Sequence, residues 1–309
     1  MPLYKESDKL KVFSRSFKVN PSGSFALICI NYFHDEGTKA FLRNLDRLDH
    51  ADRVRTILVN NSAKSPDDST FDHLNLNCLR LDVINAPENL GYFGGAQKAL
   101  ESLQEDKTQT FPEFVIISNT DIHIQDNSFI DRLGSLSLKE NCAILSPKIV
   151  SELSCKDQNP YMIHRPKKWR MHFYKWIFAT PGLNILYPLL AVIKKNIQLY
   201  CSKRGQTNAT SKQLIQLDKN CREIYAPHGS FMIFTRAYFQ FGGTFLHQPF
   251  LFGEEITVAE FARNKDLSVL YCPILQVYHE EHVTTGLIPS KKIRNYIAEA
   301  SRYCADQYF

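Results

Sequence analysis

The chain has 309 residues, of which 44% are hydrophobic and 22% are charged. These proportions are typical of a globular protein with a large core, and they exclude a disordered chain, a collagen and a disulfide scaffold. The eight cysteines are scattered without a Cys-x-x-Cys pair. We therefore expect reduced thiols and a cytoplasmic protein, and neither a zinc knuckle nor a framework of disulfides. The first residues include no apolar signal segment, so export is not expected.

The net charge of +5 is unevenly distributed along the chain. Residues 158–217 contain ten Lys or Arg and no Asp or Glu. One segment thus carries the entire excess of positive charge, which favours an anionic partner.

The first half of the chain alternates apolar runs with helical patterns, which is typical of a parallel sheet with helices on its faces. Strands are expected at 25–32, 55–59, 79–84, 114–118 and 142–150, and helices at 38–48 and 95–104. The alternation stops after residue 150 and resumes with strands at 229–235 and 268–271, strand-like residues 273–278, and helices at 255–264 and 290–308. The prediction is an α/β fold with a mostly parallel central sheet, preceded by an extension at 1–24 and carrying a helical insertion at 151–220.

Polar residues end several of the expected strands. Ligands of open α/β sheets bind beyond the carboxyl ends of the strands, so these residues are candidates for a binding site. Taken singly, each of them is also a common turn residue. They are Asn31, Asn60 with Asn61, Asn89, and Asn119 with Asp121.

The loop that begins at Asn89 is rich in glycine and opens a helix. Gly91, Gly94 and Gly95 let backbone N–H groups approach a ligand, and a helix start favours an anion. The spacing is not Gly-x-Gly-x-x-Gly, so a nicotinamide site is a poor fit. The alternative is a tight strand-to-helix turn.

Three acidic residues are candidates for chemistry. Asp121 follows an apolar strand, where a carboxylate is suited to hold Mg²⁺ or Mn²⁺ against a diphosphate, or alternatively to cap a helix. Glu254 and Glu255 follow an aromatic run and precede a helix, as a general base at a cleft edge would, although acids also favour helix starts. His279 and His282 are three residues apart after a strand, which does not fit the zinc-protease helix. One of these histidines is a candidate to complete a metal site that Asp121 begins, and the alternative is a lone surface histidine.

Taken in order, these segments resemble a family 2 glycosyltransferase, in particular the bacterial rhamnosyltransferase-like members that build surface polysaccharides. The resemblance extends from about residue 25 to residue 286. The segments that carry it are Asn31, Val59-Asn60-Asn61-Ser62, the loop 89–96, Ser118-Asn119-Thr120-Asp121-Ile122, Gly229-Ser230-Phe231-Met232, Phe241-Gly242-Gly243, 250–255 and Tyr278-His279.

The resemblance implies a GT-A fold, with a nucleotide-sugar-binding half at 25–150 and an acceptor-binding half with a C-terminal helix at 221–309. It implies an inverting, metal-dependent transfer of a hexosyl or deoxyhexosyl group to a glycan or a lipid-linked glycan. The implied donor-binding residues are Asn31, Asn60, Asn61, Asn89, Gly91, Gly94, Gly95, Asn119 and Asp121. Asp121 and His279 are the implied ligands of Mg²⁺ or Mn²⁺, and Glu255, beside Glu254, is the implied catalytic base.

The chain departs from the family pattern at three places. Asn60 stands where an Asp is usual, Asn119-Thr120-Asp121 replaces Asp-x-Asp, and Glu254-Glu255 replaces Glu-Asp. A non-catalytic subunit with the same fold is therefore an alternative. A sugar nucleotidyltransferase is a second alternative, although the glycine loop contains no Lys or Arg.

The insertion combines the basic segment with an apolar stretch at 176–193. Two prolines, a glycine and an asparagine interrupt that stretch, so a membrane-spanning helix is not expected. Its basic and aromatic flanks predict contact with a membrane surface through 164–204, on the inner face of the cytoplasmic membrane. The alternative is a helical hairpin packed on the protein. No nucleic-acid motif is present.

Overall fold

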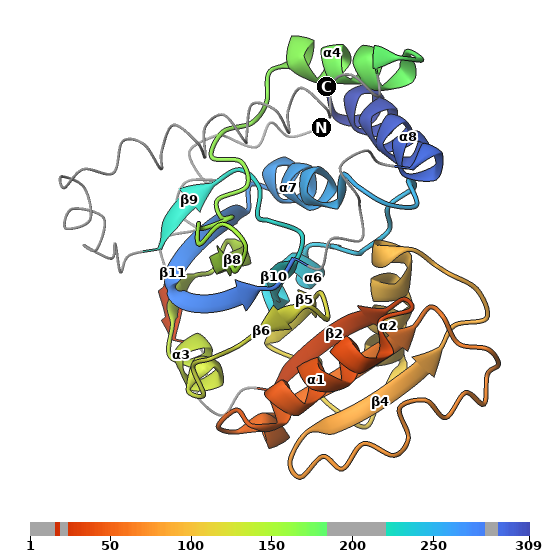
Figure 1. Cartoon of the computed structure of the whole chain (residues 1–309). Helices are drawn as coiled ribbons and strands as arrows, with labels where there is room; N and C mark the ends of the chain where they lie inside the picture. The colour runs from red at the N-terminus through yellow and green to blue at the C-terminus, as the bar shows by residue number, and fades with distance from the viewer. Residues whose placement is uncertain (1–15, 19–23, 184–220, 282–289) are drawn as a thin grey trace, which may run out of the picture.

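The structure is a computed structural model that describes residues 16–18, 24–183, 221–281 and 290–309. Most of the predicted extension at 1–24, namely 1–15 and 19–23, and most of the predicted insertion, from 184 to 220, lie outside the described residues. The fold within them is a central sheet with helices on both faces (Figure 1).

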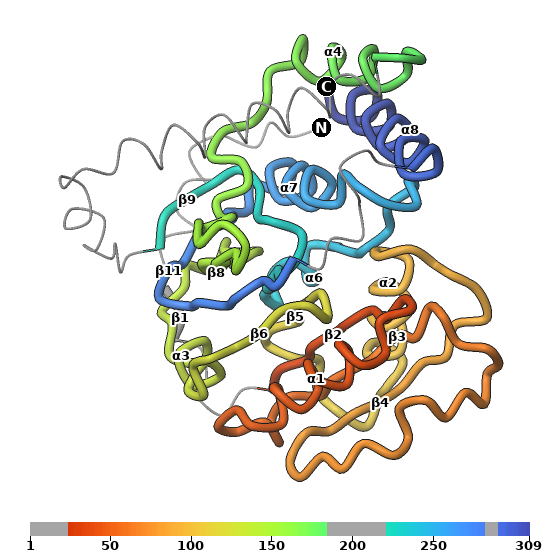
Figure 2. The backbone as a smooth tube through the Cα atoms, in the orientation of Figure 1, coloured from red at the N-terminus to blue at the C-terminus, as the bar shows by residue number. Residues whose placement is uncertain are grey.

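The strands of the central sheet lie in an order different from their order along the chain. In spatial order they are β4 (Arg80–Asn85), β3 (Val54–Asn60), β2 (Phe25–Asn31), β5 (Phe114–Ser118), β10 (Phe231–Thr235), β8 (Cys142–Ser151), β11 (Ser268–His279) and β6 (Ile122–His123), with β9 (Arg222–Ile224) also paired to β11. A separate small sheet joins β1 (Ser16–Lys18) to β7 (Ser137–Lys139). The segments β2 to α2 and β9 to α8 occupy opposite sides of the molecule, as the chain colours in Figure 2 show.

Strand direction decides which residues meet at one edge of this sheet. Strands β4, β3, β2 and β5 are parallel. Strand β10 is antiparallel to both β5 and β8, so β8 runs in the direction of β5, and β11 is parallel to β8. The carboxyl ends of β2 to β5, β8 and β11 therefore lie at the same edge, together with the first residue of β10.

Alternating side chains along the strands supply two cores. In β2, Phe25, Leu27 and Cys29 face one core, whereas Ala26 and Ile28 face the other. Successive side chains of a strand point to opposite faces, so a strand buried on both faces has a continuous apolar run, as β2 does. The helices are α1 (Asp35–Asp46) and α3 (Phe129–Gly134) on the first face, α2 (Tyr92–Glu105), α6 (Arg236–Gln240) and α7 (Glu254–Asn264) on the second, and α4 (Lys168–Ala179) and α8 (Lys291–Tyr308) further out.

The sequence-based elements are confirmed with three differences. The expected strand at 268–271 and the strand-like residues 273–278 are one long strand, β11. Helix α2 begins at Tyr92, so Gly94 and Gly95 belong to its first turn and not to the loop. Strand β10 begins at Phe231, two residues later than expected, and runs antiparallel to its neighbours.

The prediction of reduced cysteines is wrong for one pair. Cys221 and Cys272, 51 residues apart in sequence, form a disulfide that links the segment before β9 to β11. The thiols of Cys29, Cys142 and Cys304 are free and buried, where they pack as small apolar groups.

No helix within the described residues is long and apolar enough to cross a membrane.

Candidate active site

The two asparagines that end β2 and β3 are buried and bonded to each other. Asn31 Nδ2 donates to Asn60 Oδ1 at 3.0 Å and to Asp35 Oδ1 at 2.8 Å, and Asn31 Oδ1 accepts from Thr38 Oγ1 at 2.9 Å. Asn60 Nδ2 in turn donates to the side chain of Asn85 at the end of β4. These bonds fix the carboxyl ends of three strands relative to one another. The contact of Asn31 and Asn60 with a nucleoside stays a prediction.

Asn61 and Asn89 hold the loop that enters α2. Asn61 Nδ2 donates to the carbonyl oxygen of Gly91 at 2.9 Å, and Asn89 Oδ1 accepts from Gly91 N at 2.9 Å. Asn61 Oδ1 is buried without a hydrogen-bond partner among the described residues. Gly91 has a φ of +75°, and a Cβ there would collide with the backbone oxygen of Phe250. The glycine loop thus lies directly against the segment that leads to Glu254 and Glu255.

Asp121 and His279 meet where β5 and β11 end and β6 begins. Asp121 Oδ2 lies 3.3 Å from His279 Nε2, and Asp121 O accepts from Glu280 N at 3.0 Å. Burial disfavours the charged form of Asp121, but the hydrogen bond and charge of His279 outweigh it and hold the pKa of Asp121 below its usual value. Gln158 orients the histidine, because its Oε1 lies 2.8 Å from His279 Nδ1.

The Asp121–His279 pair fits a divalent cation that also takes oxygens from a ligand. Asp121 Oδ1 is buried and has no hydrogen-bond partner within the described part of the chain. No group of three or more His, Cys, Asp or Glu side chains suited to hold a metal occurs among the described residues. Mg²⁺ and Mn²⁺ are commonly held by one or two protein side chains while phosphate oxygens and water complete the shell. Asp121 and His279 therefore fit as the protein ligands of a metal ion that is bound together with a diphosphate.

Glu255 packs against Gly229, immediately before β10. A Cβ at Gly229 would lie 2.6 Å from Glu255 Oε1, so a side chain there would force this carboxylate to move. Burial raises the pKa of Glu255, with the backbone of Gly229 opposing the shift. A carboxyl group with a raised pKa is a better proton acceptor than an ordinary one.

Glu254 is held by its own turn. Its Oε1 accepts from the backbone N–H of Phe252 at 3.0 Å, and Phe252 has a φ of +73°. Burial and the neighbouring Glu255 raise the pKa of Glu254 to about 8. Glu254 therefore stabilises the turn that starts α7, whereas Glu255 reaches the start of β10.

A backbone hydrogen bond between the segments beside β5 and β10 brings Asp121 near Glu255. Asn119 N donates to Ser230 O at 2.8 Å, which fixes the segment that leads to Asp121 beside Gly229 and hence beside Glu255. Tyr92, at the start of α2, donates from its hydroxyl to Gly229 O at 3.0 Å. After burial, the charges of Glu254, Glu255 and Asp121 raise the pKa of Tyr92 furthest, because all three carboxylates lie around it.

His228 belongs to the same group, although sequence reasoning did not identify it. Its ring centroid lies 6.0 Å from that of His279, and its Nδ1 accepts from Ser230 N at 3.2 Å. Burial, followed by the charge of His279, lowers the pKa of His228 to about 4, so the ring is neutral at pH 7 and carries its proton on Nε2. The only signal in the sequence was its position directly before Gly229-Ser230.

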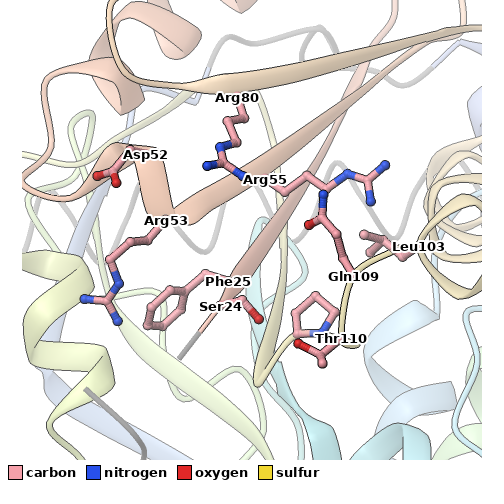
Figure 3. Close-up of a pocket in the computed structure, with 10 residues that line it drawn as sticks. Ser24, Phe25, Asp52, Arg53, Arg55, Arg80, Leu103, Gln109 and Thr110 are labelled. Carbon is pink, nitrogen blue, oxygen red and sulfur yellow. The ribbon is translucent and has the colours of Figure 1, made fainter. Parts of the chain in front are cut away.

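A separate cavity of about 210 Å³ lies at the opposite edge of the sheet, where β2, β3 and β4 begin (Figure 3). Arg55, which lines it, pairs with Asp82 and Asp106, and Arg53 lies 3.6 Å from Asp131. Two of the three arginines that line the cavity, Arg53 and Arg55, therefore lie beside carboxylates. The cavity contains none of the predicted site residues.

The described site residues, from Asn31 to His279, all lie at the carboxyl edge of the sheet. Gly95 and Asn119 are also there, and a Cβ added at Gly95 would meet the side chains of Ile30 and Asn61. His282 lies outside the described residues. The donor, metal and base roles of these residues stay predictions, which are taken up below.

Solved structures of glycosyltransferases are similar to this chain. GalNAc-T7 with UDP, GalNAc and Mn²⁺ aligns at a TM-score of 0.51 and 10% identity, over 90% of this chain and 48% of that one. The mannosyltransferase PcManGT of Pyrobaculum calidifontis, in complex with GDP-Man and Mn²⁺, aligns at 0.49 and 12% identity, over 96% of this chain and 74% of that one. Residues 1–349 of S. aureus TarS in complex with UDP-GlcNAc align at 0.46 and 14% identity, over 85% and 60%.

The alignment with GalNAc-T7 has the highest TM-score of the three, and at 10% identity it shows a shared fold. The chain therefore has a GT-A-type α/β fold and spans about half the length of GalNAc-T7. No protein-family model and no curated protein matches the sequence.

Proposed function

We propose that this protein is a metal-dependent glycosyltransferase that uses a nucleotide-sugar donor. The observation that carries the proposal is the junction of β5 and β10, where the Asn119–Ser230 hydrogen bond sets the Asp121–His279 pair beside the Gly229–Glu255 contact. One edge of the sheet thereby holds a cation-binding carboxylate and a second carboxylate with a raised pKa. Transfer of a sugar from a nucleoside diphosphate to a hydroxyl group can use both of them. The cation neutralises the departing diphosphate, and the base accepts the proton of the hydroxyl.

The donor would lie between the glycine loop and Asp121. GalNAc-T7, whose fold the chain shares, is bound to UDP, GalNAc and Mn²⁺. Asp121 and His279 would hold Mg²⁺ or Mn²⁺, which supplies positive charge to the departing diphosphate. The start of α2 adds backbone N–H groups and the positive end of a helix dipole. His228 Nε2–H is a further donor for a phosphate or sugar oxygen.

Glu255 acts as the general base in a single in-line displacement. Its carboxylate takes the proton of the acceptor hydroxyl as that oxygen bonds to the anomeric carbon. The bond from the anomeric carbon to the diphosphate oxygen breaks, and its electron pair leaves with the nucleoside diphosphate. Attack opposite the leaving group inverts the configuration. Positioning of the two substrates contributes much of the rate.

We further propose the finer assignment that the family resemblance implies. The protein would be a family 2 enzyme of the rhamnosyltransferase-like kind, and its acceptor a glycan or lipid-linked glycan of a bacterial surface polysaccharide. It would act in the cytoplasm at the inner face of the membrane, which residues 164–204 would contact.

A donor screen tests the proposal at the level of binding. Ligands that bind the native state raise its melting temperature, so a nucleotide sugar with Mn²⁺ should do so, and chelation should remove the effect. A shift produced by nucleoside triphosphates and sugar 1-phosphates, and by no nucleotide sugar, would instead support a nucleotidyltransferase.

The Gly229–Glu255 contact gives a prediction that leaves the glutamate itself intact. In Gly229→Ala the added Cβ must displace the carboxylate, since it would lie 2.6 Å from Oε1. A misplaced catalytic group costs roughly 10²-fold in rate, so turnover should fall by about that factor while donor affinity is retained. Steady-state kinetics and a donor titration measure both. Unchanged turnover would mean that Glu255 does not act from this position.

The raised pKa of Glu255 predicts an acid limb in the pH profile. The base must be deprotonated to accept a proton, so kcat/KM should fall as pH falls through a pKa above the ordinary value of 4.5. Glu254, with a pKa of about 8, is protonated over this range, so Glu254→Gln removes no charge there and should leave the limb in place. A limb at the ordinary glutamate pKa in both proteins would contradict the assignment.

A further inference from the structure

Helix α4 presents three large aromatic side chains to solvent. Trp169 is 66% exposed, Phe173 44% and Trp176 58%. Their spacing of four and three residues places them along one face of the helix. Soluble proteins seldom expose a contiguous group of large rings without a binding partner.

The opposite face of α4 packs on the protein. Met171 is buried with Ile256, Cys304 and Ala305, and Tyr174 packs against the same cluster. Lys175 pairs with Asp306 of α8. Figure 1 shows α4 alongside α8 at the periphery of the molecule. The helix is thus fixed on one side, and the described part of the chain leaves its aromatic face uncovered.

The first turn of α4 is basic without a compensating acid. Lys167, Lys168 and Arg170 are exposed, and none has a carboxylate partner among the described residues. Cations at a helix N-terminus oppose the helix dipole, and no acidic residue lies in this turn. These three cations therefore do not stabilise the helix. Their position beside the rings is explained if this end of α4 binds an anionic surface.

We infer that α4 is a membrane-docking helix whose aromatic face, Trp169, Phe173 and Trp176, inserts among anionic lipid headgroups. The inference rests on the membrane contact included in the proposed function and names the surface that makes it. A row of rings flanked by Lys and Arg is the composition of helices that lie in the bilayer interface, where an indole is favoured because one end is apolar and the other polar. The cations fit the negative headgroups.

The sequence offers a direct probe of this docking. The chain has two tryptophans, Trp169 and Trp176, and both are on the proposed face. Tryptophan fluorescence therefore reports on α4 alone. With phosphatidylglycerol vesicles we expect a blue shift and quenching by brominated acyl chains. With phosphatidylcholine vesicles both effects should be much weaker, and added salt should weaken binding to the anionic vesicles.

Variants measured by vesicle sedimentation separate the rings from the charges. Replacing the three rings with Ser should weaken binding by roughly tenfold for each ring that loses its contact with lipid. Replacing Lys167, Lys168 and Arg170 with Gln should weaken it by roughly fivefold for each cation, mainly at low salt. Controls that remove exposed groups elsewhere should bind as the parent does: Leu153 and Leu246 to Ser for apolar area, and Lys98, Lys107 and Lys265 to Gln for charge.

Three results would overturn the inference. The first is no vesicle binding by the parent, and the second is vesicle binding by the ring variant equal to that of the parent. The third is a parent that is a dimer by light scattering and a ring variant that is a monomer, which would make this face a contact between two copies. Nucleoside diphosphate release without vesicles, measured on the same proteins, keeps this test separate from the proposed function. Release without vesicle binding refutes only the docking helix, and ring-dependent binding without release refutes only the transferase.

Discussion

Glu255→Gln should retain donor binding and lower turnover by roughly 10²–10⁴-fold, the range that a positioned proton acceptor contributes. Gln has almost the same shape as Glu, so its fit against Gly229 is preserved while the ability to accept a proton is lost. The neutral amide also removes a buried charge, so the variant should unfold at a temperature no lower than the parent. Single-turnover kinetics with saturating donor, together with a donor titration, measure the two effects separately.

Glu254→Gln is the matched control, because it changes the adjacent residue in the same way. The Gln side-chain oxygen still accepts from the Phe252 N–H, so the turn before α7 should persist. We expect a much smaller loss of turnover than in Glu255→Gln. A greater sensitivity at Glu254 would move the base by one residue, and unchanged turnover in both variants would place it elsewhere.

Asp121→Asn should abolish most of the effect of metal on donor binding while the fold remains intact. A neutral amide is a poor ligand for Mg²⁺ or Mn²⁺. In the parent, Asp121 Oδ1 has no hydrogen-bond partner among the described residues and is free to bind the cation, and the variant removes its negative charge. Loss of a residue that hydrogen-bonds to a metal ligand lowers affinity roughly 10–100-fold. Loss of the ligand itself should lower donor affinity in Mn²⁺ by more than this. Calorimetric titration with and without chelator measures the change.

Gln158→Leu provides a graded comparison for Asp121→Asn. It removes the side chain that orients His279 but leaves both proposed ligands in place. Its loss of affinity should lie within that 10–100-fold range and should depend on metal. Donor binding that is indifferent to Asp121→Asn and to chelator would show that this pair holds no catalytic cation.

The sequence predicted the order of the main helices and strands because local periodicity encodes them. The unbroken apolar run from Phe25 to Ile30 is visible in the sequence, and because successive side chains of a strand point to opposite faces, it contributes to two cores. The direction of β10 was not predictable in this way, since a short apolar strand reads alike in a parallel and an antiparallel position. Strand β6 has two residues, too few for any period.

The site was predictable where a residue ends a strand, and not where it depends on contacts between distant segments. Asp121 and His279 were both identified, and their contact follows from the pairing of β6 with β11. His228 was missed because a lone histidine before a strand has no pattern. The Cys221–Cys272 disulfide was missed because two scattered cysteines carry no spacing signal.

The central claim is that this chain transfers a sugar from a nucleotide to a hydroxyl. The most direct test is nucleoside diphosphate release in Mn²⁺, with each nucleotide sugar that raises the melting temperature and a panel of glycan and lipid-linked acceptors. We expect acceptor-dependent release by the parent, loss of release in chelator, and a rate in Glu255→Gln lower by at least roughly 10²-fold. A nucleotide sugar that binds with metal but releases no diphosphate with any acceptor would contradict the claim, and it would identify the chain as a non-catalytic protein of the same fold.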